Sequence, residues 1–185
     1  CDASKPLLKR LAMEAPGTYN HSLQLGTMCE AAAEAIGARG LLARVGAYYH
    51  DIGKINKPKY FGENQHGTNA HESLTPEMSM LIITGHVKAA YEMAREYGLP
   101  AVLHEFISSH HGTTVAQYFY HVATEQAHHD PLEPPPAESH FRYPGPQPPS
   151  QQAGILLFAY VPDASVRAVD YPTPPPYHAP VHTTS

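Results

Sequence analysis

The sequence predicts an all-α protein, a helical bundle followed by a proline-rich C-terminal extension. Apolar residues recur every three or four positions through most of the first 130 residues, which is typical of helices that bury one face. No segment alternates polar and apolar residues, and no Asn-Gly pair marks a hairpin turn. Of the 19 prolines, 5 lie in residues 1–130 and 14 in residues 131–185. Helices are therefore expected in the first part and extended chain in much of the second.

The first three helices are expected at residues 6–15, about 22–36 and about 41–50. Pro16-Gly17 is expected to break the chain after the first helix, and Gly37 to cap the second. In the second helix, Leu25, Met28 and Ile36 fall near one face, which is the predicted buried face. In the third, Gly46 would let a neighbouring element approach closely.

Thr75-Pro76-Glu77 has the residues of a helix start, with an N-cap threonine, a proline at the first helical position and an acid in the first turn. The apolar stripe of this fourth helix is expected to follow Met80, Ile83, Val87, Ala90, Ala94 and Tyr97. Further helices are expected at 101–109, 114–126 and 154–160, with loops at 55–74 and 130–150. Pro162 is expected to end the last helix, which gives a helical core at 1–129, a proline-rich loop and final core helix at 130–161, and a disordered tail at 162–185.

Composition excludes several classes of protein. The longest apolar runs, at about 80–83 and 154–161, are far shorter than the ~20 residues of a membrane-spanning helix, so we expect a soluble domain. The formal charge of -5 argues against binding a nucleic-acid polymer. The two cysteines form no CxxC motif, which argues against a disulfide scaffold or a thiolate zinc site. The first residues contain neither an initiator methionine nor a leader, which indicates a piece of a longer protein.

The candidate chemistry begins with His50-Asp51, an adjacent pair at the predicted end of the third helix. Imidazole and carboxylate groups are ligands that Mn and Fe accept, although one such pair alone is more often a capping or surface pair. Four other histidines lie at predicted helix ends or beside a core stripe: His21, His86, His110 and His111. Lys54, Lys57 and Lys59 directly follow the pair. Metal ligands beside lysines in an acidic chain indicate a site for a phosphate group.

Longer strings carry a resemblance to a known family. The chain resembles the HD-domain metal-dependent phosphohydrolases, and in particular the cytoplasmic HD domain of the seven-transmembrane HD-hydrolase receptors of bacteria, over about residues 5–159. The strings that carry the resemblance are Glu14-Ala15-Pro16-Gly17-Thr18-Tyr19, Ala47-Tyr48-Tyr49-His50-Asp51-Ile52-Gly53-Lys54, Glu63-Asn64-Gln65, Leu81-Ile82-Ile83-Thr84, Ser109-His110-His111-Gly112-Thr113-Thr114 and Phe141-Arg142-Tyr143-Pro144-Gly145-Pro146.

The resemblance implies hydrolysis of cyclic di-AMP to pApA at a centre of two divalent metal ions, Mn or Fe. One ion would be held by His21, His50 and Asp51, and Asp51 would bridge to a second ion held by His86, His110 and His111. His50, Asp51 and Lys54 would be the catalytic residues, with Lys54 contacting a phosphate oxygen. Arg142 would either contact phosphate or hold the proline-rich loop, and Asn64 and Tyr118 are further candidates for contacts to base or ribose.

The chain departs from the family pattern at Tyr160. The family has an aspartate here, which the resemblance implies as a ligand of the first metal. A neutral phenol, with a pKa near 10, is a poor substitute for a carboxylate. We therefore expect incomplete occupancy of the first metal site and reduced hydrolysis. The resemblance ends beyond this residue, and both a shifted reading frame and a divergent natural tail are compatible with the sequence that follows.

Two other functions stay open at this point. One is a catalytically dead domain that senses a cyclic dinucleotide by binding it, which Tyr160 favours. The other is a broader HD nucleotidase or dNTP hydrolase, against which the Gly-Thr-Thr and Phe-Arg-Tyr-Pro-Gly-Pro strings argue. In the parent receptor the domain would lie at the cytoplasmic face of the bacterial inner membrane, with the membrane reached only through the rest of that protein. Assembly as a homo-oligomer is compatible with the sequence.

Overall fold

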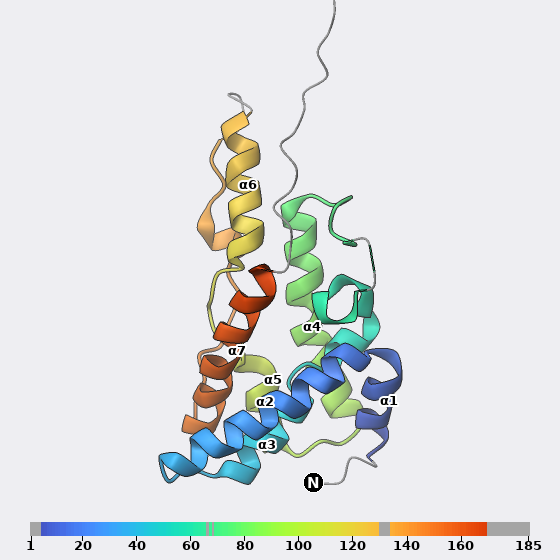
Figure 1. Cartoon of the computed structure of the whole chain (residues 1–185), viewed down its shortest axis with the longest axis vertical. Coiled ribbons are helices and arrows are strands. Elements are labelled where there is room, and N and C mark those ends of the chain that lie inside the picture. The colour runs from blue at the N-terminus through green and yellow to red at the C-terminus, as the bar shows by residue number, and fades with distance from the viewer. Residues whose placement is uncertain (1–4, 66, 68, 130–133, 170–185) are drawn as a thin grey trace, which may run out of the picture.

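A computed structural model describes residues 5–65, 67, 69–129 and 134–169, and this part of the chain is built almost wholly of helices (Figure 1). Val115 and Arg142 form an isolated antiparallel bridge. No helix within these residues is both long enough and apolar enough to span a bilayer. The α-helices are α1 (Pro6–Glu14), α2 (Pro16–Ala35), α3 (Gly40–Tyr49), α4 (Pro76–Glu96), α5 (Ala101–Ser109), α6 (Gln117–His129) and α7 (Gln151–Val169).

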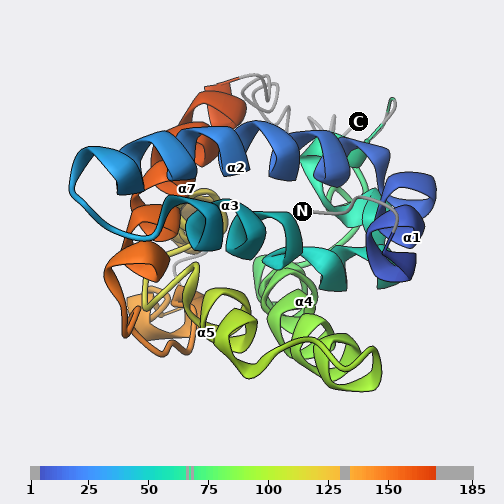
Figure 2. The same cartoon turned by 90° about the horizontal axis from the view of Figure 1, so that it is seen from below.

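The larger of two apolar clusters among the described residues lies between α1, α2, α3, α5 and α7. The long helix α2 lies along α3 and α7, and α3 also contacts α5 (Figure 2). Leu11, Ile52, Phe106 and Leu156 are completely buried in this cluster. A β-carbon on Gly46 would lie 2.3 Å from the Phe106 ring, so the expected close approach at this glycine is confirmed.

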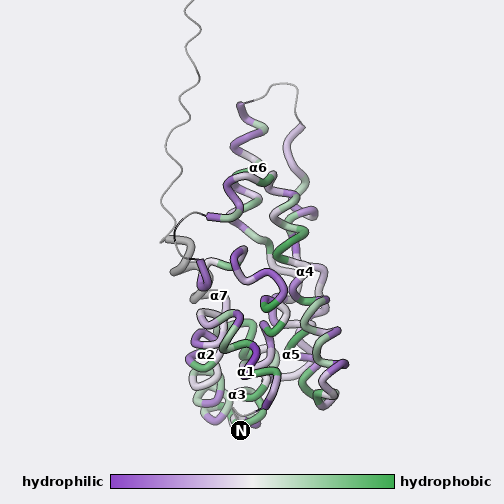
Figure 3. Tube along the Cα trace, turned by 90° about the vertical axis from the view of Figure 1, so that its right-hand side faces the viewer, coloured by the Kyte–Doolittle hydropathy of each residue, from purple (hydrophilic) through white to green (hydrophobic). Residues whose placement is uncertain are grey.

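A smaller cluster joins α4 to α6 and to the 3₁₀ helix Glu138–Phe141. Its buried members are Phe61, Met80, Ile83, Ala123 and Phe141. Only Ala123 of α6 is buried, and this helix extends away from the main bundle (Figures 1 and 3). Because α4 contributes to both clusters, its middle turn lies at their junction.

Most predicted helices are confirmed, and α5 has the predicted bounds. The predicted start of α2, at about residue 22, was wrong, because the helix begins at Pro16. Ala15 is the residue that leaves the helical conformation (φ -139°, ψ 66°), and Pro16 then opens α2 at its first position, where a proline loses no helical hydrogen bond. The predicted buried face of α2 was correct at Leu25 but wrong at Met28 and Ile36, which are 59% exposed. The observed buried face comprises His21, Leu25, Cys29 and Ala33.

Two other expectations need correction. The buried stripe of α4 passes through His86 instead of Val87, and Tyr97 is 38% exposed. Pro162 does not end the last helix, because α7 continues to Val169. A proline inside a helix removes one hydrogen bond, here the bond to the carbonyl of residue 158, and the helix continues past it. Of the expected disordered tail at 162–185, residues 162–169 are helical as the end of α7, and residues 170–185 lie outside the described residues. Helix α6 begins three residues later than predicted.

Candidate metal centre

Two pairs of adjacent residues reach the site from the ends of helices. His50 caps α3, and Asp51 (φ -109°, ψ 16°) leaves the helical conformation before the 3₁₀ helix Ile52–Asn56. His110 caps α5, and His111 follows it. Neighbouring side chains on a regular helix point about 100° apart, so the change of backbone direction lets each pair face one site. All four residues are buried.

The third element is the middle of α4, which supplies His86. The 3₁₀ helix that follows Asp51 lies directly against α4, and Gly53 makes this approach feasible. A β-carbon at Gly53 would lie 1.9 Å from the His86 carbonyl oxygen. Any larger residue would therefore separate Asp51 from His86.

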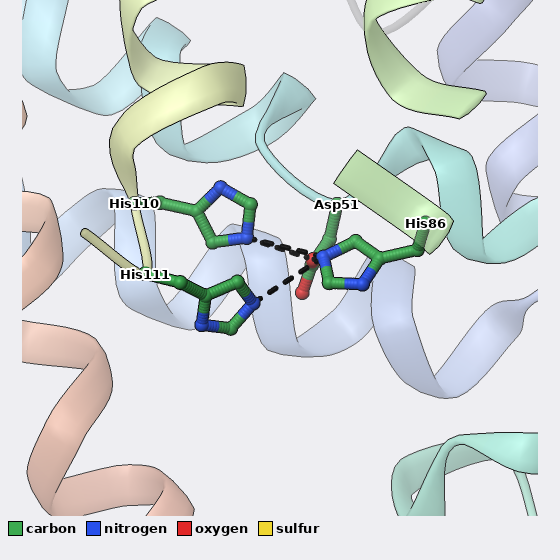
Figure 4. A group of neighbouring side chains, drawn as sticks. All are labelled: Asp51, His86, His110 and His111. Carbon is green, nitrogen blue, oxygen red and sulfur yellow. Dashed lines mark hydrogen bonds and ion pairs between the residues drawn. The ribbon is translucent and has the colours of Figure 1, made fainter. Parts of the chain in front are cut away.

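One group of ligand atoms surrounds the Oδ1 atom of Asp51 (Figure 4). The Nε2 atoms of His86 and His110 lie 3.1 Å and 3.4 Å from it. These two nitrogens are 3.2 Å apart, and the Nε2 atom of His111 is 3.3 Å from that of His86. The structure thus brings together the four residues predicted for the second metal.

A second group faces the other oxygen of the same carboxylate. The Nε2 atom of His50 lies 3.0 Å from Asp51 Oδ2. Ligand atoms of His21, His50 and Asp51 all lie within 4.8 Å of one another, and all three residues are buried. His21 comes from the first turns of α2. Asp51 therefore belongs to both groups, as the predicted bridging role requires.

Backbone carbonyls fix the protonation of three of these imidazoles. The Nδ1 atoms of His50, His86 and His110 face the carbonyl oxygens of Ala47 (2.6 Å), Ile83 and Ile107 (2.9 Å). A carbonyl only accepts hydrogen bonds, so each Nδ1 carries a proton, and Nε2 is the ring nitrogen that can bind an ion when the imidazole is neutral. Lone pairs this close to one another and to a carboxylate repel unless a cation or a proton lies between them. The donor set therefore fits a divalent cation bound by neutral imidazole and carboxylate groups.

The charge states of the site agree with this fit. Burial raises the pKa of Asp51, but its interactions with His50 and Lys54 outweigh burial, so the pKa lies well below its ordinary value. Burial lowers the pKa of His110 to about 4, although Asp51 opposes the shift. Burial and the neighbouring histidines lower the pKa of His111 well below 6.5. At neutral pH the site thus presents the Asp51 carboxylate and neutral imidazoles at His110 and His111.

Lys54 lies at the edge of the site between two acids. Its Nζ atom is 2.8 Å from Asp51 Oδ2 and 2.7 Å from Glu63 Oε1. Burial lowers the pKa of this ammonium, but the charges of Asp51 and Glu63 outweigh burial and raise the pKa well above 10.5. Glu63 also accepts a hydrogen bond from the Thr18 hydroxyl at 2.9 Å. Sequence reasoning gave Glu63 no role, although it lies in one of the strings that carry the family resemblance.

A pocket of about 210 Å³ opens beside these residues. Lys54, Glu63 and His86 line its polar side, and most of the rest of its wall is aromatic. The aromatic residues are Tyr60, Phe61, Tyr118, Phe119, Tyr143 and Tyr160, and His71 completes the rim beside them. The Tyr143 ring stacks on His111 with 3.8 Å between the ring centroids.

Other predicted substrate residues lie outside the lining of this pocket. Asn64 accepts a hydrogen bond from the Thr18 backbone and donates one to its hydroxyl, which fixes the start of α2. Arg142 donates to the Thr113 carbonyl at 2.9 Å and pairs with Glu138. Of the two roles considered for Arg142, these contacts match the one that holds the proline-rich loop.

The predicted lysine cluster does not gather at the site. Lys54 is buried, whereas Lys57 and Lys59 are exposed. The Lys59 ammonium lies over the Tyr60 ring, 5.3 Å from its centroid. Among these three lysines, only Lys54 lines the pocket.

Tyr160 lies among the site histidines. Its ring centroid is 4.8 Å from that of His111 and 6.1 Å from those of His21, His50 and His110. Tyr160 therefore lies beside the candidate metal ligands, at the place expected from the sequence.

Comparison with known proteins gives the family. The family model of the HD domain matches residues 18–156. This chain belongs to the HD-domain family. Over 170 residues the HD domain is 45% identical to the cyclic-di-AMP phosphodiesterase PgpH of Bacillus subtilis (strain 168), and over 169 residues it is 43% identical to PgpH of Listeria monocytogenes (strain 10403S). Both matches cover 91% of this chain but 23% of the relative, so the HD domain spans about a quarter of the length of these proteins.

Solved structures give the same result for the fold. The crystal structure of the L. monocytogenes PgpH HD domain matches with a TM-score of 0.80 at 43% identity, covering 91% of this chain and 76% of that chain. The same domain in complex with cyclic di-AMP matches with a TM-score of 0.79 at 42% identity, covering 91% and 75%. The predicted all-α HD-domain fold is therefore confirmed.

Proposed function

We propose that this HD domain is a metal-dependent phosphodiesterase that hydrolyses cyclic di-AMP to the linear dinucleotide pApA. The observation that carries the proposal is Asp51, whose two oxygens face two different sets of histidines beside an aromatic pocket. A carboxylate shared in this way is the arrangement that two-metal phosphoryl chemistry uses. The relatives named as cyclic-di-AMP phosphodiesterases, and the related domain solved with cyclic di-AMP, support this choice of substrate.

The ligand groups divide between two divalent ions, Mn or Fe. His21, His50 and Asp51 would hold the first, and Asp51, His86, His110 and His111 would hold the second. When bound, such ions stabilise charge on a phosphoryl oxygen and activate a water nucleophile. The carbonyl bonds to Nδ1 keep three of the imidazoles oriented before any ion arrives.

Lys54 supplies the positive charge for the substrate. Its contact with Glu63 at 2.7 Å holds the ammonium at the pocket wall. Held there, the ammonium would donate a charge-assisted hydrogen bond to a non-bridging phosphate oxygen of the substrate. Glu63, fixed by Thr18, is thus the residue that positions Lys54.

The aromatic wall provides faces for the adenine bases. Tyr60, Phe61, Tyr118 and Phe119 line the pocket together with Tyr143. Stacking of a base on an aromatic face contributes about 1–3 kcal/mol. Stacking alone does not distinguish adenine from guanine, so selectivity requires hydrogen bonds to the base edge.

The rest of the parent protein supplies the cellular context. Because the domain spans 23% of its relatives' length, we infer that it works as one part of a longer chain. From the resemblance to HD-hydrolase receptors, we propose that it works at the cytoplasmic face of the bacterial inner membrane.

The test is a comparison of substrates with the metal-loaded domain. Protein purified without oxygen and loaded with Mn²⁺ or Fe²⁺ is given cyclic di-AMP, cyclic di-GMP or dATP, and products are separated by chromatography. We expect pApA to form well ahead of any other product. His86→Gln should abolish this activity, whereas His104→Gln, on α5 outside both ligand groups, should retain it.

Two outcomes would favour the other functions. Faster hydrolysis of dATP would make the domain a nucleotidase. Calorimetric binding of cyclic di-AMP without cleavage would make it a sensor, which the Tyr160 ring among the site histidines favours as the second candidate.

A further inference from the structure

Tyr160 occupies the inward face of α7. Ala153 and Leu156, seven and four residues before it, are completely buried, whereas Phe158 is 76% exposed. Spacings of three and four residues place side chains on one face of a helix. Tyr160 is therefore the next member of the buried stripe after Leu156, at the turn where α7 passes the site histidines.

The Tyr160 ring completes a triangle with the two histidines of the first ligand group. The ring centroids of His21 and His50 are 5.8 Å apart, and that of Tyr160 is 6.1 Å from each. The ring planes are inclined by 63°, 71° and 72°, so the three rings meet edge to face. Tyr160 thus meets each histidine of the first group much as these two meet each other, and its ring also contacts His111 of the second group, with 4.8 Å between the ring centroids.

The electrostatics place the phenol on the side of Asp51. The negative form of Tyr160 contributes, after Asp51 and Glu63, to raising the pKa of Lys54. The Lys54 ammonium lies 2.8 Å from Asp51 Oδ2, the oxygen that faces the first group. Tyr160 and Lys54 also line the same pocket. The phenol and this carboxylate oxygen therefore share one positive neighbour.

We propose that Tyr160 is a ligand of the first metal ion through its phenolate oxygen. The inference rests on the proposed metal centre. On binding, the phenol O–H bond breaks, its proton passes to water or buffer, and the oxygen bonds to the ion, so no redox step is involved.

Ferric iron is the ion that tests this ligand, because it is a stronger Lewis acid than Mn²⁺ or Fe²⁺ and binds phenolate oxygen.

The test uses the absorption of an iron–phenolate bond. Metal-free protein receives ferric iron as its citrate complex, so that no oxidant is needed. Metal content is measured on the same samples by mass spectrometry. Wild-type protein should develop a visible charge-transfer band with phenolate modes in resonance Raman spectra. Tyr160→Phe should lose the band and fall from two iron ions per chain to one.

Tyr143→Phe is the matched control, since this neighbouring phenol stacks on His111 and lines the same pocket. It should keep the band. Tyr160→Asp should lose the band but bind Mn²⁺ in the first group at least about 10-fold more tightly, the smaller of the changes seen when the surroundings of a metal are altered.

The failures of the two proposals are distinguishable. Wild-type protein that binds iron without a visible band, or a band that survives in Tyr160→Phe, would overturn the role of Tyr160 and leave the metal centre standing. Protein that binds neither ferric iron nor Mn²⁺ would overturn both.

Discussion

Metal-free protein should lose stability as the pH falls from 6.5 to 4, because His110 stays neutral in the folded state. Burial lowers the pKa of this imidazole from 6.5 to about 4. In the unfolded chain the same group binds a proton near pH 6.5. Between these values the unfolded state binds more protons, so the free energy of unfolding falls with falling pH.

The size of the effect follows from the shift. One pKa unit corresponds to about 1.4 kcal/mol, so His110 alone should account for about 3 kcal/mol between pH 6.5 and pH 4. His111, whose pKa is also lowered by burial, acts in the same direction. The carboxylates of Asp51 and Glu63 have pKa values lowered by their positive neighbours in spite of burial, to about 2 for Glu63. The stability that they contribute is present above their unfolded pKa values, near 4, and is lost mainly below this window.

Urea denaturation in the presence of a chelator, at several pH values from 7 to 4.5, measures this dependence. His110→Gln removes the titrating group and should flatten the pH dependence, leaving the part due to His111. His128→Gln is the control, because that side chain is 67% exposed, and it should leave the dependence unchanged. The reasoning is refuted if His110→Gln and wild-type protein lose equal free energy of unfolding over this range.

Three further predictions concern the residues around Asp51. Asp51→Asn removes the charge that both ligand groups share, so metal affinity should fall by more than the ~10–100-fold typical of losing an outer-shell partner; metal content near that of wild-type protein would contradict the assignment. Gly53→Ala should lower the free energy of unfolding by about 1–3 kcal/mol, because the new β-carbon meets the α4 backbone at 1.9 Å. The control Gly85→Ala meets nothing within 4 Å and should stabilise α4 by about 0.5–1 kcal/mol, and urea denaturation compares the two variants. Lys54→Met leaves the buried Asp51 and the partly buried Glu63 without their ammonium, which should cost about 3–5 kcal/mol in metal-free protein. Because an ion on Asp51 replaces part of that charge, Mn²⁺ should raise the melting temperature of Lys54→Met more than that of wild-type protein, and an equal rise would count against this account.

Local signals predicted most of the helices. The Thr75 side chain accepts a hydrogen bond from the Met78 backbone at 3.2 Å, as an N-cap residue should. Pro16 was predicted only as the end of the first helix, whereas it also opens α2. A proline is compatible with both positions, and the non-helical conformation of Ala15 decides where one helix ends and the next begins. The predicted buried stripe of α4 passes through Val87, one residue from the observed stripe, because the polar residue His86 was not counted among the core positions. Packing around a buried imidazole is not visible in an apolar pattern.

The ligand residues could be found from the sequence, but their grouping could not be derived from spacing. His21 and Asp51 are 30 positions apart, and His86 and His110 are 24 positions apart on different helices. The division into two groups came from the family resemblance, and the structure brings the same residues together. Glu63 was missed because it lies in an irregular segment with no periodic pattern, and its contacts with Lys54 and Thr18 depend on tertiary structure.

The helix ends add a second reason for a cation at this centre. α3 and α5 both end where their capping histidines enter the site, so the last carbonyl groups of two helices lie beside it. A helix carries partial negative charge at its C-terminal end, which favours a nearby cation by about 0.3–1 kcal/mol. One of these ends carries His50 of the first ligand group and the other carries His110 of the second, and both add to the charge of Asp51. The helix ends therefore favour a cation at each of the two groups, in the same direction as the carboxylate that the groups share.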